Sequence, residues 1–403
     1  MSVTTDRHLP VGPPNRPCLS RVLIFLGTDS TIGRELDMAR LSAGGRLLWV
    51  AALFTLAGVG LLATAGSAPG GTAVGHETYT VTNLVSDGAI PAARTDMHLK
   101  NAWGLTALPT SPWWVANNAT GTSTLYNGDG VPQFGATPLV VSVDDDPTGA
   151  VANPTTDFAV APNAPARFIF ATESGTIRGW NPGVPPPPLS TQTEQVVDNS
   201  AAGSVYKGLA IGSVGGNNFL YANDFVNGTI DVFDKNFQSV KMTFVDPGLP
   251  AGYGPFGIQN IGGHLFVTYA KQSGGTDELH GQGLGFVDEF ATDGTFIARV
   301  ATHGQLNAPW GLAKAPPNFG RFSGDLLVGN FGDGTINAYA LQSDGTWAHR
   351  GQLRTADHKP VTIDGLWGLG FGNGSASGAT NALYFTAGPN DESDGLFGRI
   401  EAQ

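Results

Sequence analysis

The chain has 403 residues, and its 33 acidic against 21 basic side chains give a formal net charge of −12 at pH 7. An acidic chain without a basic patch repels phosphate, which excludes nucleic acid as a partner. The one cysteine, Cys18, lies near the N-terminus, so the rest of the chain has neither disulfides nor thiol chemistry. With 57 glycines, 27 prolines and only 13% charged residues, the composition predicts many short strands joined by tight turns.

An apolar run at residues 47–65 follows two arginines and ends in small residues. This pattern is typical of a secretory signal peptide, although the run is also long enough for an uncleaved membrane anchor. We assign residues 38–75 to this leader and a short linker, because Met38 would start a signal peptide of ordinary length. Residues 1–37 then form an overextended N-terminus. We expect a secreted, periplasmic or cell-envelope protein, anchored to the membrane if the leader is retained.

From residue 76 onward the chain repeats one hairpin pattern, as in "WWVANNATGTSTLY" (113–126), "FLYANDFVNGTIDVFD" (219–234) and "LLVGNFGDGTINAY" (326–339). A phrase such as "WGL" or "KGL" precedes each hairpin. With its glycine as the anchor, and Asp157 of "PTTDFAVAP" as the second member, the anchors are residues 104, 157, 208, 257, 311 and 368. Near-equal units of this length, each with about four short strands, predict a β-propeller and not a sandwich.

The last unit ends without an outer strand, whereas residues 77–86, "ETYTVTNLVS", alternate like a strand and precede the first unit. We expect this N-terminal strand to pair with the final blade, which closes the ring and removes an exposed edge. Residues 76–403 are therefore predicted to form one all-β domain, a six-bladed β-propeller with four-stranded blades, which we expect to be a monomer.

The hairpin "NGTIDVFD" resembles those of NHL-repeat, streptogramin-lyase-like and gluconolactonase-like six-bladed propellers. The opening "NAWGL…PTSPWWVANNATGTSTLYNGDG" more closely resembles an uncharacterised family of secreted bacterial propellers, some with a PEP-type C-terminal sorting tail; this chain ends directly after its last strand. The resemblance covers the whole 76–403 domain and implies the fold but almost no function. Gluconolactonase-like propellers hold a divalent cation with a Glu, an Asn and an Asp from different blades. Here Glu173, Asn118 or Asn223, and Asp224 could play those parts.

In propellers, hairpin turns and connections between blades emerge together around the mouth of the central channel, where ligands commonly bind. The residues before the anchors are Trp103, Thr156, Lys207, Phe256, Trp310 and Trp367. Four aromatic rings there would form an apolar funnel that stacks on a sugar or a planar molecule, or would pack between blades.

Two charged residues depart from the repeat, because Asp157 replaces an anchor glycine and Lys207 replaces an aromatic ring. On adjacent blades, they are expected to lie close together at the mouth, as a structural or a functional pair. Glu173 shares a blade with Asp157, and two carboxylates there could serve acid–base chemistry or hold Ca²⁺. Asp157, Glu173 and Lys207 are thus the candidate catalytic residues. The candidate ligand-binding residues are Trp103, Asn118, Asp157, Glu173, Lys207, Asp224, Phe256, Trp310, Asn330 and Trp367.

Other polar groups give weaker signals. His280 lies in the fourth hairpin turn, but the histidines occur in loops of different lengths, so we interpret them as scattered and assign no metal ligand. The acidic segment "NDESDG" (390–395) lacks a full Ca²⁺-ligand spacing and is interpreted as a solvated turn.

No G-x-S-x-G or H-E-x-x-H motif and no phosphate-binding glycine loop is present in the sequence. Three functions stay open, because a propeller hosts both binders and enzymes. The first is an exported protein that binds a small molecule, glycan or peptide at the channel mouth. The second is a lactonase-type hydrolase or streptogramin-lyase-type lyase, with Ca²⁺ or another divalent cation on the channel axis. The third is a cell-envelope module that binds another protein.

Overall fold

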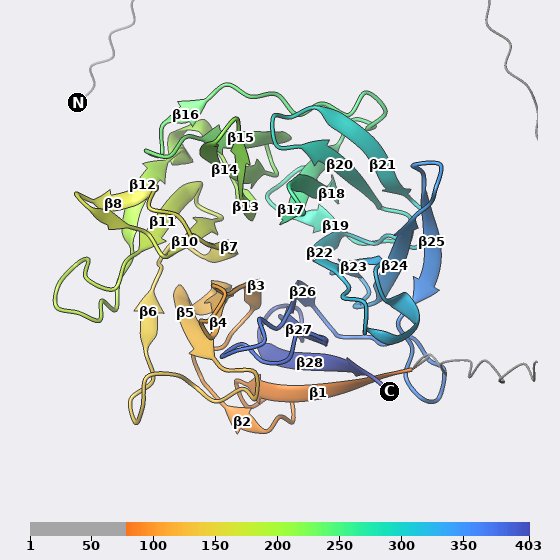
Figure 1. Cartoon of the computed structure of the whole chain (residues 1–403), viewed down its shortest axis with the longest axis horizontal. Helices are drawn as coiled ribbons and strands as arrows, with labels where there is room; N and C mark the ends of the chain where they lie inside the picture. The colour runs from red at the N-terminus through yellow and green to blue at the C-terminus, as the bar shows by residue number, and fades with distance from the viewer. Residues whose placement is uncertain (1–77) are drawn as a thin grey trace, which may run out of the picture. The chain divides into compact units, whose positions relative to one another are not determined.

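The computed structural model describes residues 78–403, which form six sheets arranged as blades around a central axis (Figure 1). The predicted six-bladed β-propeller is therefore confirmed. The leader-like run lies outside the described residues, so export stays a prediction. Within residues 78–403, the helices are three short 3-10 turns, η1 (Asn118–Thr120), η2 (Ser200–Ala202) and η3 (Gly320–Phe322). No helix in this part of the chain has the length and apolar character needed to span a membrane.

Each blade is an antiparallel sheet whose first strand lies nearest the axis. Blade 1 contains β3 (Ala102–Thr106), β4 (Trp113–Asn117), β5 (Thr122–Tyr126) and β6 (Val140–Ser142). Blade 2 contains β7 (Pro147–Ala152), β10 (Phe168–Thr172), β11 (Thr176–Trp180) and β12 (Glu194–Asp198), with a small hairpin, β8 (Ala159–Ala161) and β9 (Ala164–Pro165), inserted after β7. Blade 3 contains β13 (Tyr206–Val214), β14 (Asn217–Asp224), β15 (Thr229–Phe233) and β16 (Ser239–Val240).

The remaining blades follow the same order. Blade 4 contains β17 (Tyr253–Ile261), β18 (His264–Gln272), β20 (Gly285–Ala291) and β21 (Phe296–Thr302), with β19 (Glu278–Leu279) beside β18. Blade 5 contains β22 (Pro309–Lys314), β23 (Leu326–Asn330), β24 (Ile336–Leu341) and β25 (Trp347–Gln352). Blade 6 contains β26 (Leu366–Phe371), β27 (Ala382–Ala387), β28 (Leu396–Ala402) and β1 (Tyr79–Ser86), flanked by β2 (Arg94–Thr95).

A glycine in each innermost strand lets neighbouring blades approach closely. A Cβ added to Gly208 would lie 2.6 Å from the carbonyl oxygen of Phe256 in the next blade, and one added to Gly257 would lie 2.0 Å from that of Trp310. A side chain cannot occupy such a space, so the contact requires glycine. The same close approach recurs around the ring at Gly104, Gly149, Gly311 and Gly368. Five of the six predicted anchors are therefore confirmed.

The predicted anchor of blade 2, Asp157, is wrong. The innermost strand of this blade is β7, and its Gly149 makes the inter-blade contact, with an added Cβ 2.6 Å from the backbone nitrogen of Leu209. Asp157 follows β7, so it lies at the end of the ring opposite Lys207, where its carboxylate accepts a 2.8 Å hydrogen bond from Asn218. The phrase "TDFAVAP" matches the apolar pattern of the other units, but it lacks the glycine that the close contact needs.

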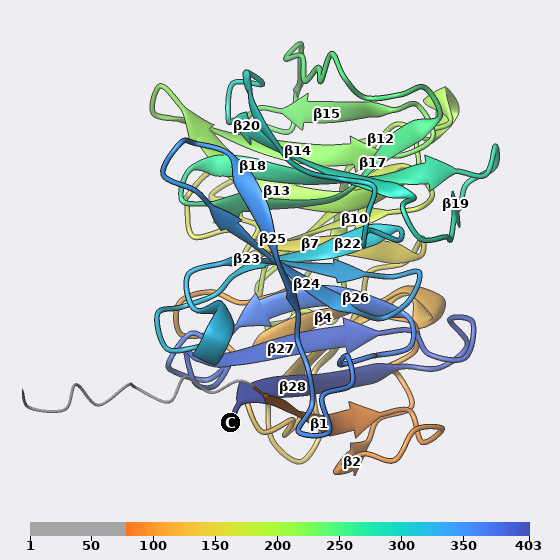
Figure 2. The same cartoon turned by 90° about the vertical axis from the view of Figure 1, so that its right-hand side faces the viewer.

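The N-terminal strand closes the ring, as predicted. β1 pairs antiparallel with β28, from Tyr79 opposite Ala402 to Ser86 opposite Leu396, and the two strands lie side by side in Figure 2. The buried Tyr79 also reaches blade 5, where its hydroxyl donates a 3.1 Å hydrogen bond to the carbonyl oxygen of Phe319. One strand thus joins the first part of the described chain to the last two blades.

Candidate functional site

A pocket of about 310 Å³ lies at the end of the channel where the hairpin turns and the connections between blades meet. We call it the mouth pocket. Blades 1 to 6 all contribute to its lining, which consists of Trp103, Glu173, Lys207, Asp277, Glu278, His280, Phe331, Asp391 and Glu392. A larger open groove runs beside β1 and includes Thr82, Asp357 and Lys359, but it lacks this concentration of ionisable groups.

The floor of the mouth pocket is a cluster of aromatic rings, which we call the aromatic plug: Trp103, Phe256, Trp310, Phe331 and Trp367. Trp367 is sandwiched between Trp103 and Phe331, with ring centroids 3.6 and 3.8 Å apart. Trp310 meets the edges of both other indoles. Trp103 is only 2% exposed and Trp367 is fully buried, so of the two alternatives for these rings the open funnel is wrong, and the rings have a packing role. The rings pack against one another because their flat faces bury large apolar areas when stacked.

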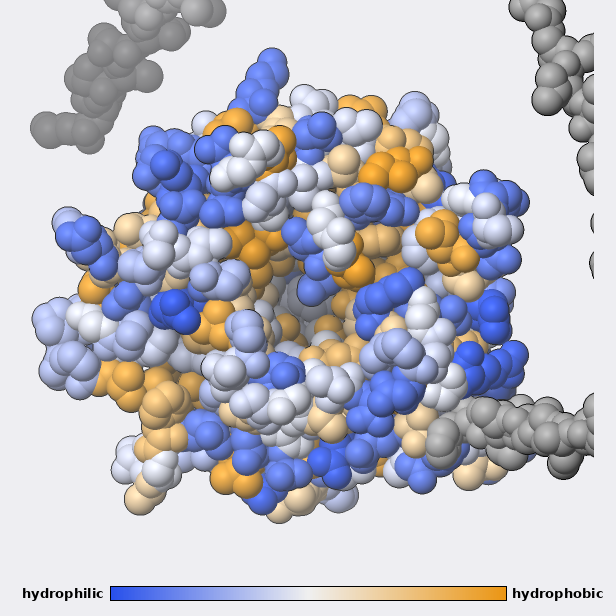
Figure 3. All heavy atoms as spheres, in the orientation of Figure 1, coloured by the Kyte–Doolittle hydropathy of each residue, from blue (hydrophilic) through white to orange (hydrophobic). Residues whose placement is uncertain are grey.

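The aromatic plug separates two environments. Trp103 lines the polar mouth pocket, whereas Trp310 lines the lumen beyond it, together with apolar side chains such as Leu209, Ile258 and Leu369. Figure 3 views the molecule from the end of the channel opposite the mouth pocket, where hydrophobic residues surround a central hollow. The mouth pocket is therefore closed at its inner end.

A chain of hydrogen bonds crosses the mouth from blade to blade. The Trp367 indole donates to Asn101 (3.1 Å), Asn101 donates to Asn118 (3.2 Å), and Asn118 donates to one oxygen of Glu173 (2.9 Å). The other oxygen of Glu173 accepts from Lys207, whose side chain is 1% exposed and lies 5.0 Å from the ring of Trp103. Each oxygen of the Glu173 carboxylate thus accepts one hydrogen bond, one from an amide and one from an ammonium group.

These hydrogen bonds decide the predictions about two candidate catalytic residues, Lys207 and Glu173. Lys207 does pair with a carboxylate of the adjacent blade, but the partner is Glu173 and not Asp157. Because both of its oxygens are engaged, by Asn118 and by Lys207, Glu173 is placed to fix the ammonium of Lys207 at the pocket wall and not to reach a substrate.

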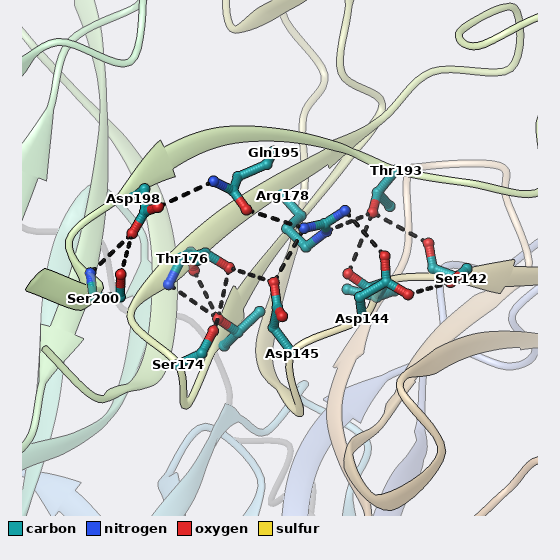
Figure 4. A network of polar contacts seen from close by, with 12 residues as sticks. Ser142, Asp144, Asp145, Ser174, Thr176, Arg178, Thr193, Gln195, Asp198 and Ser200 are labelled. Carbon is teal, nitrogen blue, oxygen red and sulfur yellow. Dashed lines mark hydrogen bonds and ion pairs between the residues drawn. The ribbon is translucent and has the colours of Figure 1, made fainter.

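The hairpin turn that carries Glu173 is supported by the connection between blades 1 and 2. Arg178 bonds Asp144 and Asp145, each over 3.1 Å, and lies between them in Figure 4. Asp144, Asp145 and the following Asp146 have φ angles of 61°, 57° and 55°, a left-handed backbone that non-glycine residues adopt at a cost. The carbonyl of Asp146 then accepts a 3.2 Å hydrogen bond from the backbone nitrogen of Glu173.

The opposite wall of the pocket comes from the 273–284 loop of blade 4. β19 folds back and pairs with β18, which places Glu278 beside His280 with 3.2 Å between the Glu278 carboxylate and Nε2 of His280. This hydrogen bond raises the pKa of His280 above its ordinary value, and the nearby Glu392 and Asp391 carboxylates raise it further. His280 thus lies at the mouth, as its place in the fourth hairpin turn indicated, but it lines the pocket and is not the scattered histidine that we expected.

Glu392 comes from the turn after β27. Three consecutive residues, Asn390, Asp391 and Glu392, have left-handed φ angles of 56°, 52° and 63°. Burial raises the pKa of Glu392 to about 7, and the carboxylates of Glu278 and Glu173 add to the rise, against the effect of Lys207 and a hydrogen bond from Asn101. The interpretation of "NDESDG" as a solvated turn is therefore wrong for Glu392, which is half-buried in the pocket.

The other predicted ligand-binding residues do not line the pocket. Asp224 is 1% exposed and accepts hydrogen bonds from the backbone nitrogen of Val205, just before β13, and from Asn227 in its own turn. Asn330 is fully buried and bonds the backbone of residues 305 and 307. Both are turn residues with structural roles. Phe256, Trp310 and Trp367 belong to the aromatic plug, which leaves Trp103, Asn118, Glu173 and Lys207 at the mouth.

The arrangement does not fit the divalent cation that the gluconolactonase resemblance implies. Both oxygens of Glu173 are engaged by Asn118 and Lys207, so a cation bound there would face an ammonium group. The amide nitrogen of Asn223 donates to the backbone carbonyl of Gly257, whereas its buried Oδ1 has no hydrogen-bond partner among residues 78–403. Among residues 78–403, no three His, Asp or Glu side chains are grouped to hold a metal ion.

Relatives of the chain are found among viral proteins. No protein-family model matches it. The "Uncharacterized protein R648" of Acanthamoeba polyphaga mimivirus is 34% identical over 339 residues, which cover 80% of each chain. The "Uncharacterized protein L690" of the same virus is 32% identical over 335 residues, or 80% of this chain and 86% of that one. The chain belongs to the family of these mimivirus proteins. Their viral origin gives no support to the resemblance to secreted bacterial propellers with sorting tails.

The solved structures that resemble this member of the mimivirus family are more distant than the viral relatives. A streptogramin B lyase shares 13% identity and a TM-score of 0.45, covering 81% of this chain and 97% of the lyase. A gluconolactonase from Xanthomonas campestris shares 18% identity and a TM-score of 0.40, covering 59% of this chain and 73% of the enzyme. At such identities, the comparison concerns the propeller fold and not the chemistry.

Proposed function

We propose that the mouth pocket is the active site of a hydrolase or lyase that acts on a small molecule by acid–base catalysis. The observation that supports this proposal is the pairing, across one pocket, of His280 and Glu392, two groups from different blades whose pKa values are both raised. Catalytic acids and bases need a pKa near the working pH, and perturbed groups in a cleft are candidates for these roles.

Each polar group then has a role. Glu392, with a pKa of about 7, retains a proton near neutrality and can donate it to a leaving group. His280 accepts a proton from water or from the substrate, with its ring oriented by Glu278. The ammonium of Lys207, fixed by Glu173, stabilises negative charge that develops on a carbonyl oxygen. The aromatic plug beneath these groups excludes water and strengthens their electrostatic effects.

A binding protein without catalysis is the second candidate. Its support is the preformed pocket, in which Asn118, Glu173 and Lys207 already hold one another and Trp103 and Phe331 of the aromatic plug line the floor. We also propose export on the basis of the leader-like segment at residues 47–65.

The variant Glu392→Gln tests the catalytic proposal. With a panel of lactones and esters, kcat should fall on the order of 10²- to 10⁴-fold, because the general acid is lost. The alkaline fall of kcat/KM, which reports deprotonation of Glu392, should disappear in the variant. His280→Ala should remove the acidic limb instead. If any panel member is turned over and neither variant slows it, the chemistry lies outside the mouth pocket.

A stability measurement accompanies this test. The folded-state pKa of Glu392 is raised from 4.5 to about 7, so its contribution to stability is complete below about pH 4.5 and is lost as the pH rises through 7. Glu392→Gln removes this loss, so its Tm relative to the intact protein should increase between pH 5 and pH 8. Asp129→Asn, a charge-matched control that lies outside the pocket at an exposed carboxylate, should show no such trend.

A further inference from the structure

The mouth pocket contains more carboxylates than its own cations can pair. Its one lysine, Lys207, pairs with Glu173, and the imidazole of His280, which is charged only when protonated, is bonded to Glu278. Three further carboxylates line the pocket, those of Asp277, Asp391 and Glu392. Within residues 78–403, none of these three forms a salt bridge.

The unpaired carboxylates come from two loops that reach the pocket from different blades. Asp277 lies in the 273–284 loop of blade 4, and Asp391 and Glu392 lie in the strained turn after β27 in blade 6. Glu392 also faces the two engaged carboxylates of the pocket, because its pKa is raised first by burial and then by Glu278 and Glu173. Such a pocket favours a positive ligand and repels carboxylates and phosphates.

A second, independent feature at the same pocket also indicates a ligand. Trp103 lines the pocket and is 98% buried, given its exposure of 2%, yet its indole nitrogen has no hydrogen-bond acceptor in the described part of the chain. A buried donor without a partner costs free energy, and an acceptor on a bound molecule would remove that cost. The ring of Phe331 lies beside His280, and the centroids of the two rings are 4.9 Å apart.

We propose that the small molecule bound at the mouth pocket carries an ammonium or guanidinium group, which lies between Asp277 of one loop and the Asp391–Glu392 turn of the other. This proposal rests on the proposed function, because it names the substrate class of the same site. The charged group pairs with the free carboxylates, its apolar part lies on Trp103 and Phe331, and a hydrogen-bond acceptor meets the Trp103 indole. The reacting bond then lies within reach of His280 and Glu392.

Calorimetric titration of the full chain with three probes of matched shape tests this inference: tryptamine (cation), tryptophol (neutral) and indole-3-propionate (anion). At pH 7.5 and low ionic strength, tryptamine should bind about tenfold more tightly than tryptophol, as one well-formed ion pair of about 1.4 kcal/mol provides, and indole-3-propionate should bind least. Higher salt should reduce the preference. Tryptamine should also release protons on binding, because a neighbouring cation lowers the pKa of Glu392.

Variants on each loop complete the test. Asp391→Asn with Glu392→Gln, and separately Asp277→Asn, should reduce the preference for tryptamine over tryptophol, whereas Asp129→Asn should keep it. Equal binding of tryptamine and tryptophol, a preference that survives both mouth variants, or no binding of any probe would overturn the proposal. The two proposals fail separately: turnover that depends on Glu392 without a preference for cations refutes only the substrate class, and a preference for cations without turnover refutes only the catalysis.

Discussion

A chain that lacks residues 78–86 should fail to fold at temperatures where the intact protein is fully native. These residues include all of β1, and their loss leaves the whole edge of β28 unpaired. It also removes the buried side chains of Tyr79, Leu84 and Val85. Burial of each contributes about 1.5–3 kcal/mol, so the total approaches the 5–15 kcal/mol by which a typical protein is stable. Thermal unfolding followed by circular dichroism measures the effect.

Two controls make this result specific. Thr80→Ala changes an exposed side chain of the same strand and should leave the Tm nearly unchanged. A synthetic peptide of residues 77–88, added in excess, should restore part of the lost stability by pairing with β28. If the truncated chain melts at the temperature of the intact chain, β1 does not close the ring in solution.

The second large effect is expected at the ion pair in the wall of the mouth pocket. Glu173→Ala should destabilise the fold by about 3 kcal/mol, because it leaves the ammonium of Lys207, 1% exposed, without its counter-ion. The value is at the lower end of the usual range for buried pairs, since Glu173 itself is 27% exposed. Urea unfolding of the variant and of the intact chain gives the difference.

The double variant Glu173→Gln with Lys207→Met provides the matched comparison. It removes both charges and keeps the amide contact to Asn118 and the apolar packing on Trp103, so it should recover most of the lost stability. If it is no more stable than Glu173→Ala, the cost arises from the loss of side-chain volume and not from the unpaired charge.

The sequence was sufficient to predict the fold because the propeller repeats its constraints. Each hairpin turn and each close contact at an anchor glycine recurs, so five anchors could be recognised from the others. Blade 2 broke the pattern, because the inserted hairpin β8–β9 follows its innermost strand and carries a phrase that resembles an anchor. A search for glycine itself, at Gly149, would have found the correct strand.

The mouth pocket was only partly predictable. Glu173 and Lys207 were recognised because each departs from an aligned repeat position. Glu278, His280 and Glu392 have no counterparts in other blades, and their meeting depends on how two loops of unequal length bend. β19 folding back on β18, and the left-handed backbone of residues 390–392, are tertiary outcomes that no local pattern encodes. The spacing of "DELH" and "NDESDG" therefore held no signal of their proximity.

The aromatic plug has a kinetic consequence, because it closes the inner end of the mouth pocket and leaves the pocket with a single opening. Whatever enters past Glu392 and His280 has to leave by the same route, since stacked indoles block the way through the ring. In the hydrolase or lyase proposed above, substrate and product would compete for this single opening, and a released product that still fits the pocket would exclude the next substrate. Turnover in such a site should show competitive inhibition by product. A wider opening, made by changes in the loops around it, should weaken this inhibition without a change in the propeller itself.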